Sequence, residues 1–478
     1  MRVNFLFIAI IIPLAGMALS GCSKTTSQKS SSASEASEVI SFVQVHHTTM
    51  PTDTADACYA GLKVQLIRGF YEKRREELFW CSHDKLQPAA DSLIYFINHA
   101  RYHGLYPDRY HSGEIQNLKN RLLTPSDFTR MESLLTDAYI SIVQHIGSGQ
   151  TAVATFRTDS LSLSSLEQVS VDGNVIDGIS RFEPAHFGYR SLKKAIRLLI
   201  DSLPGNQHET VLLHLADIPE QTNKVLQTLE VNLERWRLEH MTGRRYIFIN
   251  IPAFMLYLVE DDSVIFESKV IVGTPKTPTP EISSRIECLV TYPYWHIPRK
   301  IAAEEYLPVI QKDISFITRN HIDVLNKDGT LLNPDSVDWY RFSKNHFPVL
   351  LRQREGTENS LGIVKFVFDN PYAIFLHDTN AKKLFNSEVR AFSHGCVRLE
   401  KAIELSHYLV TGELNKKSPK IVRYLKEESR HTINLYDPIP IYIRYYTCDF
   451  RDNQFHVYKD IYMVDHRMTH KLYSVSLK

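Results

Sequence analysis

Apolar residues recur every three or four positions through residues 57–243, a spacing that predicts amphipathic helices. The clearest stripe covers 131–142, between a Pro125-Ser126-Asp127 start and a Gly147-Ser148-Gly149 end. Further stripes are Leu93, Ile97 and Ala100; Leu192, Ala195, Ile196, Leu199 and Leu203; and Val225, Leu229, Leu233 and Trp236. This region is therefore predicted to be a helical domain, with the Ser- and Asp-rich residues 151–180 as a surface connection.

The pattern changes to a strand-like one after Gly243. β-Branched and aromatic runs predict strands there, with Asp261-Asp262 as a hairpin turn. The runs are 246–251, 254–259, 264–272, 286–292, 363–368, 372–377 and 439–446. A helical stretch is predicted at 402–409, before the last of these runs. A mixed piece at about 298–359 interrupts them, helix-like at first and turn-rich later. The chain is therefore predicted to be an α+β protein, helical at 57–243 and mainly β at 244–470, with a mixed cap insertion.

The first residues have the pattern of an export signal. Arg2 precedes an apolar run at 5–18 that is too short to span a membrane comfortably, and Leu19-Ser20-Gly21-Cys22 follows. This ending resembles the bacterial lipobox, which implies that 1–22 is a lipoprotein signal peptide and that Cys22 carries lipid. The alternative is an uncleaved anchor with an incidental cysteine. The polar residues 23–56 then predict a flexible tether.

Composition removes one class of function and leaves a second question open. The formal net charge is +1, so no overall field attracts nucleic acid, and nucleic-acid binding is not expected. The six cysteines are Cys22, Cys58, Cys81, Cys288, Cys396 and Cys448. In an oxidising compartment Cys58 and Cys81 could form a disulfide, and two unpaired buried thiols are an equally good interpretation.

Candidate chemistry is concentrated between His377 and Arg398. His377 ends an apolar run, and Ser393-His394-Gly395-Cys396 follows it. A thiol nucleophile needs a base and hydrogen-bond donors for the oxyanion, and Gly395 permits the tight turn that would gather backbone amides beside Cys396. A buried thiol without function is the plain alternative, and zinc bound by His377, His394 and Cys396 is another, for which no fourth ligand is apparent.

The segment resembles the active-site signature of YkuD-type L,D-transpeptidases: a first His, then Ser-His-Gly-Cys, a hydrophobic residue and Arg. Other parts of the chain resemble the long YcbB-like branch of that family, which has an N-terminal scaffold domain. These parts include Asn250-Ile251-Pro252, Thr279-Pro280, Tyr292-Pro293-Tyr294-Trp295-His296-Ile297-Pro298, Asn232-Leu233-Glu234-Arg235-Trp236 and His103-Gly104-Leu105-Tyr106-Pro107.

The resemblance implies a role for each matching residue. Cys396 would be the nucleophile and His377 the general base, oriented by the backbone carbonyl of Asp378. His394 and Gly395 would frame the oxyanion site together with Cys396. The substrate-binding set implied is Arg398, Ser393, Tyr294 and Trp295. For Arg398 a structural ion pair is an equal alternative, and for Tyr294 and Trp295 so is a place in a core.

The resemblance also implies the reaction. The donor stem peptide of peptidoglycan would form a thioester on Cys396, and an amine of the acceptor stem would resolve it into a 3→3 cross-link, without a metal or other cofactor. A carbapenem is expected to acylate the same thiol. Water as the acceptor would make the protein an L,D-carboxypeptidase, and a wall protein as the acceptor would make it an attachment enzyme. A papain-like peptidase is disfavoured because His precedes Cys here. A catalytically inactive wall-binding scaffold is a further alternative. The expected location is the periplasm, with the lipid in the outer membrane.

Overall fold

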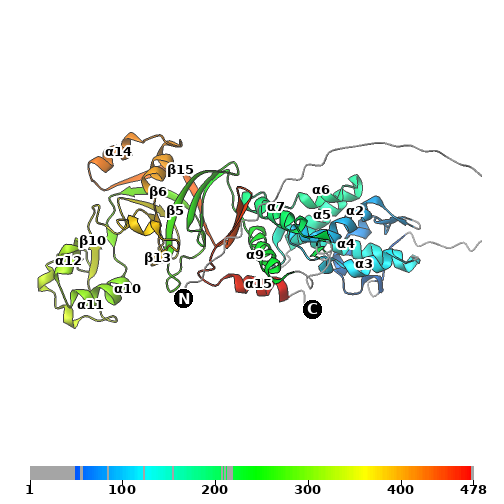
Figure 1. Ribbon diagram of the computed structural model, residues 1–478, viewed down its shortest axis with the longest axis horizontal. Helices are drawn as coiled ribbons and strands as arrows, with labels where there is room; N and C mark the ends of the chain where they lie inside the picture. The colour runs from blue at the N-terminus through cyan, green and yellow to red at the C-terminus, as the bar shows by residue number, and fades with distance from the viewer. Residues whose placement is uncertain are drawn as a thin grey trace, which may run out of the picture.

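The computed structural model describes residues 49–53, 57–82, 85–121, 124–152, 156–205, 208, 211–212 and 219–474. The predicted signal peptide, Cys22 and most of the predicted tether lie outside these residues. The molecule is elongated, with a helical half at one end, a β-sheet half in the middle and a small mixed unit at the other end (Figure 1). This architecture confirms the predicted α+β class.

The helical half is arranged around one long helix, α4 (Pro125–Ser148). Thr124 and Asp127 form a capping box at its start, and Pro125 occupies the first helical turn. Leu134, Leu135 and Ala138 are fully buried, as the predicted stripe requires. The surrounding elements are η1 (Ala57–Tyr59), α1 (Val64–Lys73), β1 (Cys81–Ser82), β2 (Lys85–Leu86), α2 (Pro88–Asn98), η2 (Ala100–His103), η3 (Pro107–Tyr110) and α3 (Ser112–Lys119).

The prediction of a surface connection at 151–180 is wrong. Helices α5 (Phe156–Asp172) and α6 (Val175–Ser180) occupy this stretch and bury Leu166 and Val169 in the core. These apolar residues are three apart but lie in a stretch rich in serine, which weakened the helical signal. Ser162 and Ser170 bond to backbone carbonyls within the helix, so these hydroxyls are satisfied without breaking it.

Two helices join the helical half to the sheet: α7 (Phe187–Asp201) and α9 (Glu220–Arg237). Trp236 of α9 stacks on Tyr446, with ring centroids 4.3 Å apart, and on Phe248 at 5.6 Å. Gly188 of α7 lies so close to the Trp236 ring that an added Cβ would be 2.1 Å from it. The two halves therefore share a close-packed aromatic contact.

The main sheet closes on itself. Its order is β13-β5-β14-β12-β11-β6-β15-β3-β4, and β4 also pairs with β5. The strands are β3 (Arg245–Asn250), β4 (Met255–Glu260), β5 (Ser263–Gly273), β6 (Ile282–Thr291), β11 (Val364–Phe368), β12 (Leu376–His377), β13 (Ala391–Ser393), β14 (Val397–Leu399) and β15 (His431–Arg444). Alternate residues such as Phe366, Leu376 and Val397 fill the core. Asp261 and Asp262 both have positive φ, as expected for the predicted hairpin turn.

The predicted strand at 372–377 is mostly a turn, because β12 contains only Leu376–His377. The Asn370 side chain accepts bonds from the amides of Tyr372 (3.1 Å) and Ile374 (3.0 Å), which holds the chain in the turn. Ala373 in this turn has a φ of 55°. The end of this turn lies beside the candidate nucleophile Cys396. The amide of the next residue, Val397, donates to the Phe375 carbonyl.

The cap, residues 298–359, has its own core beside the main sheet (Figure 1). Ile301, Leu307, Trp339 and Phe347 belong to this core. Its sheet has the order β7-β10-β8-β9, and β7 comes just before residue 298. The elements are β7 (Trp295–His296), α10 (Arg299–Ile301), the π-helix η4 (Ala302–Tyr306), α11 (Leu307–Ile310), α12 (Ser315–Arg319), β8 (Ile322–Leu325), β9 (Leu331–Leu332), η5 (Pro334–Ser336), η6 (Trp339–Arg341) and β10 (Leu350–Gln353). The predicted mixed character of the cap is confirmed.

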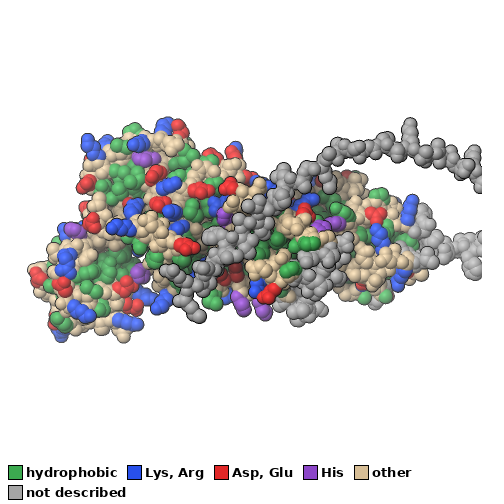
Figure 2. Space-filling model, viewed as in Figure 1, with side chains coloured by type: hydrophobic (Ala, Val, Ile, Leu, Met, Phe, Trp, Pro, Cys, Tyr) green, Lys and Arg blue, Asp and Glu red, His purple; other side chains and the backbone are tan. Residues whose placement is uncertain are grey.

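Several C-terminal elements complete the structure: η7 (Lys382–Asn386), α13 (Ala402–Thr411), α14 (Pro419–Lys426), β16 (Cys448–Arg451), β17 (Gln454–Val457) and α15 (Asp465–Ser474). Cys81 is a buried thiol that is not bonded to Cys58. Basic and acidic side chains are interspersed over the face seen in Figure 2, in keeping with the formal net charge of +1. Within the described part of the chain, none of the helices has both the length and the apolar character needed to cross a bilayer.

Candidate active site

Three neighbouring strands bring the candidate residues into one row. Lys365 of β11 is the Cα partner of His377 in β12, and His377 is the partner of Arg398 in β14. Partners across a ladder have side chains on the same face of the sheet. Because the next residues along the strands, Phe366 and Leu376, lie in the core, this row lies on the opposite face. Cys396 comes two residues before Arg398, immediately before β14.

His377 is buried and its ring is neutral. Its Nδ1 donates to the backbone carbonyl of Asp378 at 2.5 Å, which leaves Nε2 as the unprotonated nitrogen. Burial and the nearby Arg398, with a smaller effect of Lys365, lower the pKa of His377 to about 3, against the opposing carbonyls of Asp378 and Leu361. Nε2 is therefore able to accept a proton at neutral pH.

The carboxylate of Asp378 has a structural position rather than a place beside the ring. Its Oδ2 accepts the Ile363 amide at 3.0 Å, and its Oδ1 pairs with Lys382. Gly362 packs against this carboxylate so closely that an added Cβ would lie 2.3 Å from it. It is the backbone carbonyl of Asp378, and not its carboxylate, that orients the imidazole.

The Cys396 thiol is half-buried at the edge of this row. Burial raises its pKa, while the Phe375 amide and the cations Lys365 and Arg398 act to lower it. Its sulfur lies 3.9 Å from the Ala373 carbonyl. Among the described residues no hydrogen bond joins this thiol to His377. Because burial raises the pKa of Cys396 and lowers that of His377, it favours a neutral thiol beside a neutral imidazole.

The turn before Cys396 is fixed by Ser393 and Gly395. Ser393 Oγ donates to the Cys396 carbonyl at 2.5 Å and accepts the Gly395 amide at 3.1 Å. Gly395 has a φ of 116°, which favours glycine, and a Cβ there would also lie 3.0 Å from Ile374. The Gly395 amide expected at the oxyanion site is thus bonded within the turn, whereas the Cys396 amide has no protein acceptor among the described residues.

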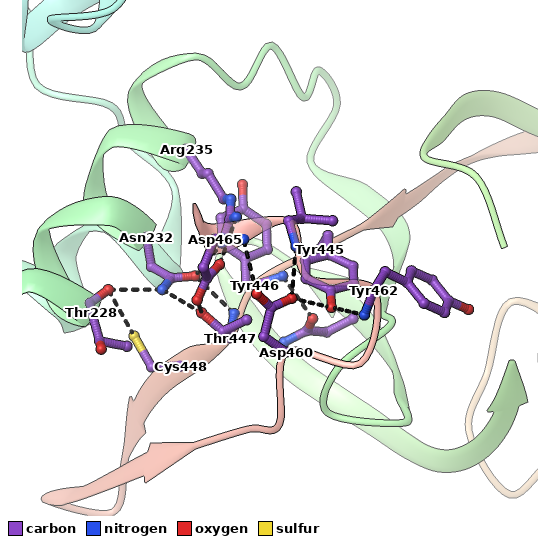
Figure 3. A network of polar contacts seen from close by, with 12 residues as sticks. Thr228, Asn232, Arg235, Tyr445, Tyr446, Thr447, Cys448, Asp460, Tyr462 and Asp465 are labelled. Atoms are coloured by element: carbon purple, nitrogen blue, oxygen red, sulfur yellow. Dashed lines mark hydrogen bonds and ion pairs between the residues drawn. The ribbon is translucent and has the colours of Figure 1, made fainter. Parts of the chain in front are cut away.

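Further hydrogen bonds link this turn to the C-terminal segment. Thr279 Oγ1 donates to the Gly395 carbonyl at 2.7 Å, and Tyr462 Oη accepts the Thr279 amide at 3.1 Å. The Tyr462 hydroxyl also donates to the Gly273 carbonyl at 2.7 Å. Figure 3 shows Tyr462 beside Tyr445, whose hydroxyl accepts the Tyr462 amide at 2.8 Å.

The same network continues to helix α9 (Figure 3). Asp460 accepts the Tyr445 hydroxyl at 2.6 Å, and Asp465 pairs with Arg235 of α9 at 2.7 Å. Asn232 of α9 accepts the Thr447 amide at 2.8 Å. A continuous set of polar contacts therefore links α9, the helix next to the helical half, with the turn that holds Cys396.

Removing the Tyr462 hydroxyl tests whether this network positions the nucleophile. Tyr462→Phe is expected to lower the rate of Cys396 acylation by about three- to tenfold, because the Thr279–Gly395 support loosens. The free energy of unfolding should fall by about 1 kcal/mol. The matched control is Tyr458→Phe, whose hydroxyl bonds to Asp449 and Arg451 instead. Equal acylation rates in the two variants would contradict the positioning role.

His394 connects the catalytic turn to the cap. Its Nε2 lies 2.8 Å from Oε1 of Glu305 in the π-helix η4, and both side chains are about half exposed. Its ring is thus turned toward the cap. No group of three or more His, Cys, Asp or Glu side chains suited to hold a metal occurs in the described ranges.

Breaking this contact tests whether the cap moves. Hydrogen exchange in residues 298–359 is expected to be faster than in β3 to β5, and to slow when a β-lactam is bound. Glu305→Gln should speed exchange in η4 while leaving β3 to β5 unchanged. Glu304→Gln is the control, since Glu304 pairs with Lys344 within the cap at 3.6 Å. Equal protection of cap and strands in both states would make the insertion a static part of the scaffold.

Tyr294 and Trp295, the two aromatic residues of the implied substrate-binding set, have different surroundings. Tyr294 is half-buried between Arg352, 4.5 Å from its ring centroid, and Arg430 at 5.6 Å. Trp295 packs on the cap core, with its ring edge-on to Tyr306. The core alternative therefore describes Trp295, while Tyr294 lies among cations.

Lys365 is a site residue that sequence reasoning missed. Its ammonium lies 3.4 Å from the ring centroid of Phe375 and interacts electrostatically with Cys396. The one available signal was the alternation of 364–368, which places Lys365 on the face away from Val364 and Phe366. Neither Lys365 nor Arg398 has an acidic partner among the described residues, so an ion pair does not account for Arg398.

Comparisons with known proteins agree with the division of the chain. Residues 244–422 match the L,D-transpeptidase catalytic domain family YkuD, and residues 65–196 match the scaffold domain family. A Haemophilus influenzae protein provisionally named L,D-transpeptidase is 36% identical over 217 residues, which cover 44% of this chain and 43% of that protein. The match thus spans less than half of the relative's length.

Two solved structures are also similar. The Ldtfm–avibactam carbamoyl enzyme is 11% identical, with a TM-score of 0.19 over 42% of this chain and 49% of that chain. A cysteine-to-serine mutant of the Enterococcus faecium L,D-transpeptidase is 11% identical, with a TM-score of 0.17 over 42% of this chain and 50% of that chain.

Proposed function

We propose that this chain, which carries a YkuD L,D-transpeptidase catalytic domain together with an N-terminal scaffold domain, cross-links peptidoglycan stem peptides through a thioester on Cys396. The observation that carries the proposal is the pairing of β12 with β14. It places a neutral, carbonyl-oriented His377 next to the strand that directly follows Cys396. A nucleophile and an oriented base on adjacent strands are what acyl transfer by a thiol requires.

In the first half-reaction, Cys396 attacks the carbonyl of the third residue of a tetrapeptide stem. His377 Nε2 takes the thiol proton as the C–S bond forms, and then gives a proton to the nitrogen of the departing D-Ala. The Cys396 amide is proposed as the oxyanion donor, because the neighbouring Gly395 amide is bonded to Ser393. Arg398 stabilises the negative charge that develops beside the thiol.

In the second half-reaction, the side-chain amine of another stem's third residue attacks the thioester. The C–N bond forms, the C–S bond breaks, and His377 accepts the proton lost by the amine. The product is a 3→3 cross-link, and the thiol is regenerated. Water or an amine of a wall protein as the acceptor would give hydrolysis or protein attachment from the same thioester.

The test is incubation with purified tetrapeptide muropeptides followed by mass analysis of the products. A dimer shorter by one D-Ala is the expected product, with a thioester-linked intermediate on Cys396 when the acceptor amine is blocked. Tripeptide alone would indicate a carboxypeptidase. A protein that acylates no stem at all, although it is folded and reacts with a thiol reagent, would contradict the proposal.

We also propose that the mature protein begins at Cys22 and is held by lipid in the periplasm, in the outer membrane, with Ser23 next to the anchor. The support is the sequence of residues 2–22 alone. Cys22→Ala is expected to move the protein from the membrane fraction to the soluble periplasmic fraction. Ser20→Thr is a control that leaves the cysteine in place. Membrane fractionation that is the same in Cys22→Ala and the parent would contradict the anchor.

A further inference from the structure

We propose that Lys365 is a substrate-binding residue whose ammonium receives a carboxylate of the donor stem peptide beside Cys396. The inference rests on the proposed transpeptidase function and adds a recognition element to it. The ligand chemistry is a carboxylate on a short peptide, and a tetrapeptide stem offers more than one: that of its second residue, that on the side chain of its third residue, and its C-terminus.

Geometry places Lys365 at the reaction centre. Its Cα partner across the β11–β12 ladder is His377, and the next strand contributes Arg398 at the same level. Neighbouring strands are separated by about 4.8 Å, so the row Lys365–His377–Arg398 is about 10 Å wide. A stem peptide whose carbonyl reaches Cys396 must pass this row.

Among the described residues, no carboxylate pairs with Lys365. The titratable groups that act on it are the thiols of Cys396 and Cys288 and the guanidinium of Arg430. Burial lowers the pKa of Arg398, and the Cys396 thiol acts in the opposite direction. Two other cations of this domain do have acidic partners: Lys382 pairs with Asp378, and Arg352 pairs with Asp323 at 2.7 Å.

An unpaired cation in a half-buried position is costly, and an anionic ligand would offset this cost. Burial lowers the pKa of Lys365, because it disfavours the charged ammonium. The flat contact with Phe375 compensates only partly, because cation–π contacts are weaker than paired charges. A substrate carboxylate would satisfy both the ammonium and the adjacent guanidinium of Arg398.

A second role for Lys365 would be to lower the thiol pKa without touching the substrate. The two roles can be distinguished by comparing donor peptides that differ in their carboxylates. Activation of the thiol would speed reaction with every donor equally, whereas carboxylate binding would matter only for donors that carry that carboxylate. Amidation of single carboxylates therefore distinguishes them, and it also identifies which carboxylate is bound.

The experiment measures kcat/KM for full-length parent and Lys365→Met protein with four tetrapeptide donors: one with all carboxylates free and three with one carboxylate amidated each. Lys365→Met is expected to lower kcat/KM for the free donor by about tenfold or more. For one amidated donor, parent and variant should show the same low value. Lys365→Arg should keep most of the parent's preference. Lys401→Met is the matched control, because Lys401 also lies over a phenylalanine ring, Phe266, at 5.6 Å and should leave all four values unchanged.

Each other outcome is decisive. An equal loss with all four donors would assign Lys365 to the thiol and overturn the proposal, as would no loss at all. If Lys365→Met does not fold, the test uses the kcat/KM values of the parent protein alone. A kcat/KM about tenfold higher for the free donor than for one amidated donor supports the site. Equal kcat/KM values for all four donors overturn it. A parent that forms a β-lactam adduct but turns over none of the stems would overturn the proposed function, and this inference with it.

Discussion

Cys396→Ala is expected to lose cross-linking activity and to form no adduct with a carbapenem, while the fold is retained. The thiol contributes little to stability, because it is half-buried and its polar contacts are weak ones, to the Phe375 amide and, at 3.9 Å, to the Ala373 carbonyl. The free energy of unfolding should change by less than about 1 kcal/mol. The chemistry, in contrast, has no substitute for the sulfur, since the thioester cannot form without it.

Intact-mass measurement checks this prediction directly. The parent should gain one carbapenem per chain, and Cys396→Ala should gain none. Cys288→Ala is the matched control. Cys288 is another half-buried thiol, on strand β6, which pairs with the β11 strand of Lys365, and it also interacts with Lys365. Its variant should keep both the adduct and the activity. A carbapenem adduct or dimer formation that persists in Cys396→Ala would rule out Cys396 as the nucleophile.

Periodicity predicted the long helices and the paired strands because it reports which face of an element is buried. The stripe at 131–142 became α4, and the hairpin of two aspartates became the turn between β4 and β5. The signal failed where polar residues separated the apolar ones, as in α5, where Leu166 and Val169 stand among serines. It failed again at 372–377, where the Asn370 side chain overrides the β propensity of the residues that follow.

The candidate nucleophile and base could be found in the sequence because their spacing and flanking residues form a motif. The groups that surround them could not, since they come from distant segments. Lys365 joins the row only through strand pairing, and Glu305 meets His394 only through the placement of the cap. Tyr462 reaches the catalytic turn through Thr279, across 183 positions of the chain. Contacts of this kind have no local sequence signature.

His377→Asn is expected to slow acylation of Cys396 by about 10²- to 10⁴-fold, the usual contribution of a positioned base. Asparagine is the informative replacement, because its amide can still donate to the Asp378 carbonyl while it offers no basic nitrogen. The turn and the strand pairing should therefore persist. Alkylation by a small thiol reagent at high pH should continue, since the thiolate then forms without help. An acylation rate within a few fold of the parent would exclude His377 as the base.

The pH dependence of the parent gives an independent check on the same residue. Because burial and Arg398 lower the pKa of His377 to about 3, the ring stays neutral at pH 5 and can act as a base. The rate constant for acylation by a β-lactam should show no loss between pH 7 and 5 that titrates near 6.5. A base at its ordinary pKa of 6.5 would instead lose about thirtyfold at pH 5. If the parent shows this loss and His377→Asn does not, His377 titrates near its ordinary pKa, and this would contradict the burial of its ring.

The same pKa shift predicts how stability responds to acid. The unfolded chain binds a proton at His377 near pH 6.5, whereas the folded chain binds it only near pH 3. Between these values the unfolded state holds more protons, so the free energy of unfolding falls as the pH falls, by up to about 1.4 kcal/mol per pH unit for each such group. His145, whose pKa burial also lowers to about 3, contributes with the same sign. His377→Asn should lose only its own part of this slope, since His145 and the other histidines whose pKa burial lowers, such as His103 and His186, keep theirs. Urea titrations from pH 7 to 4 measure the difference.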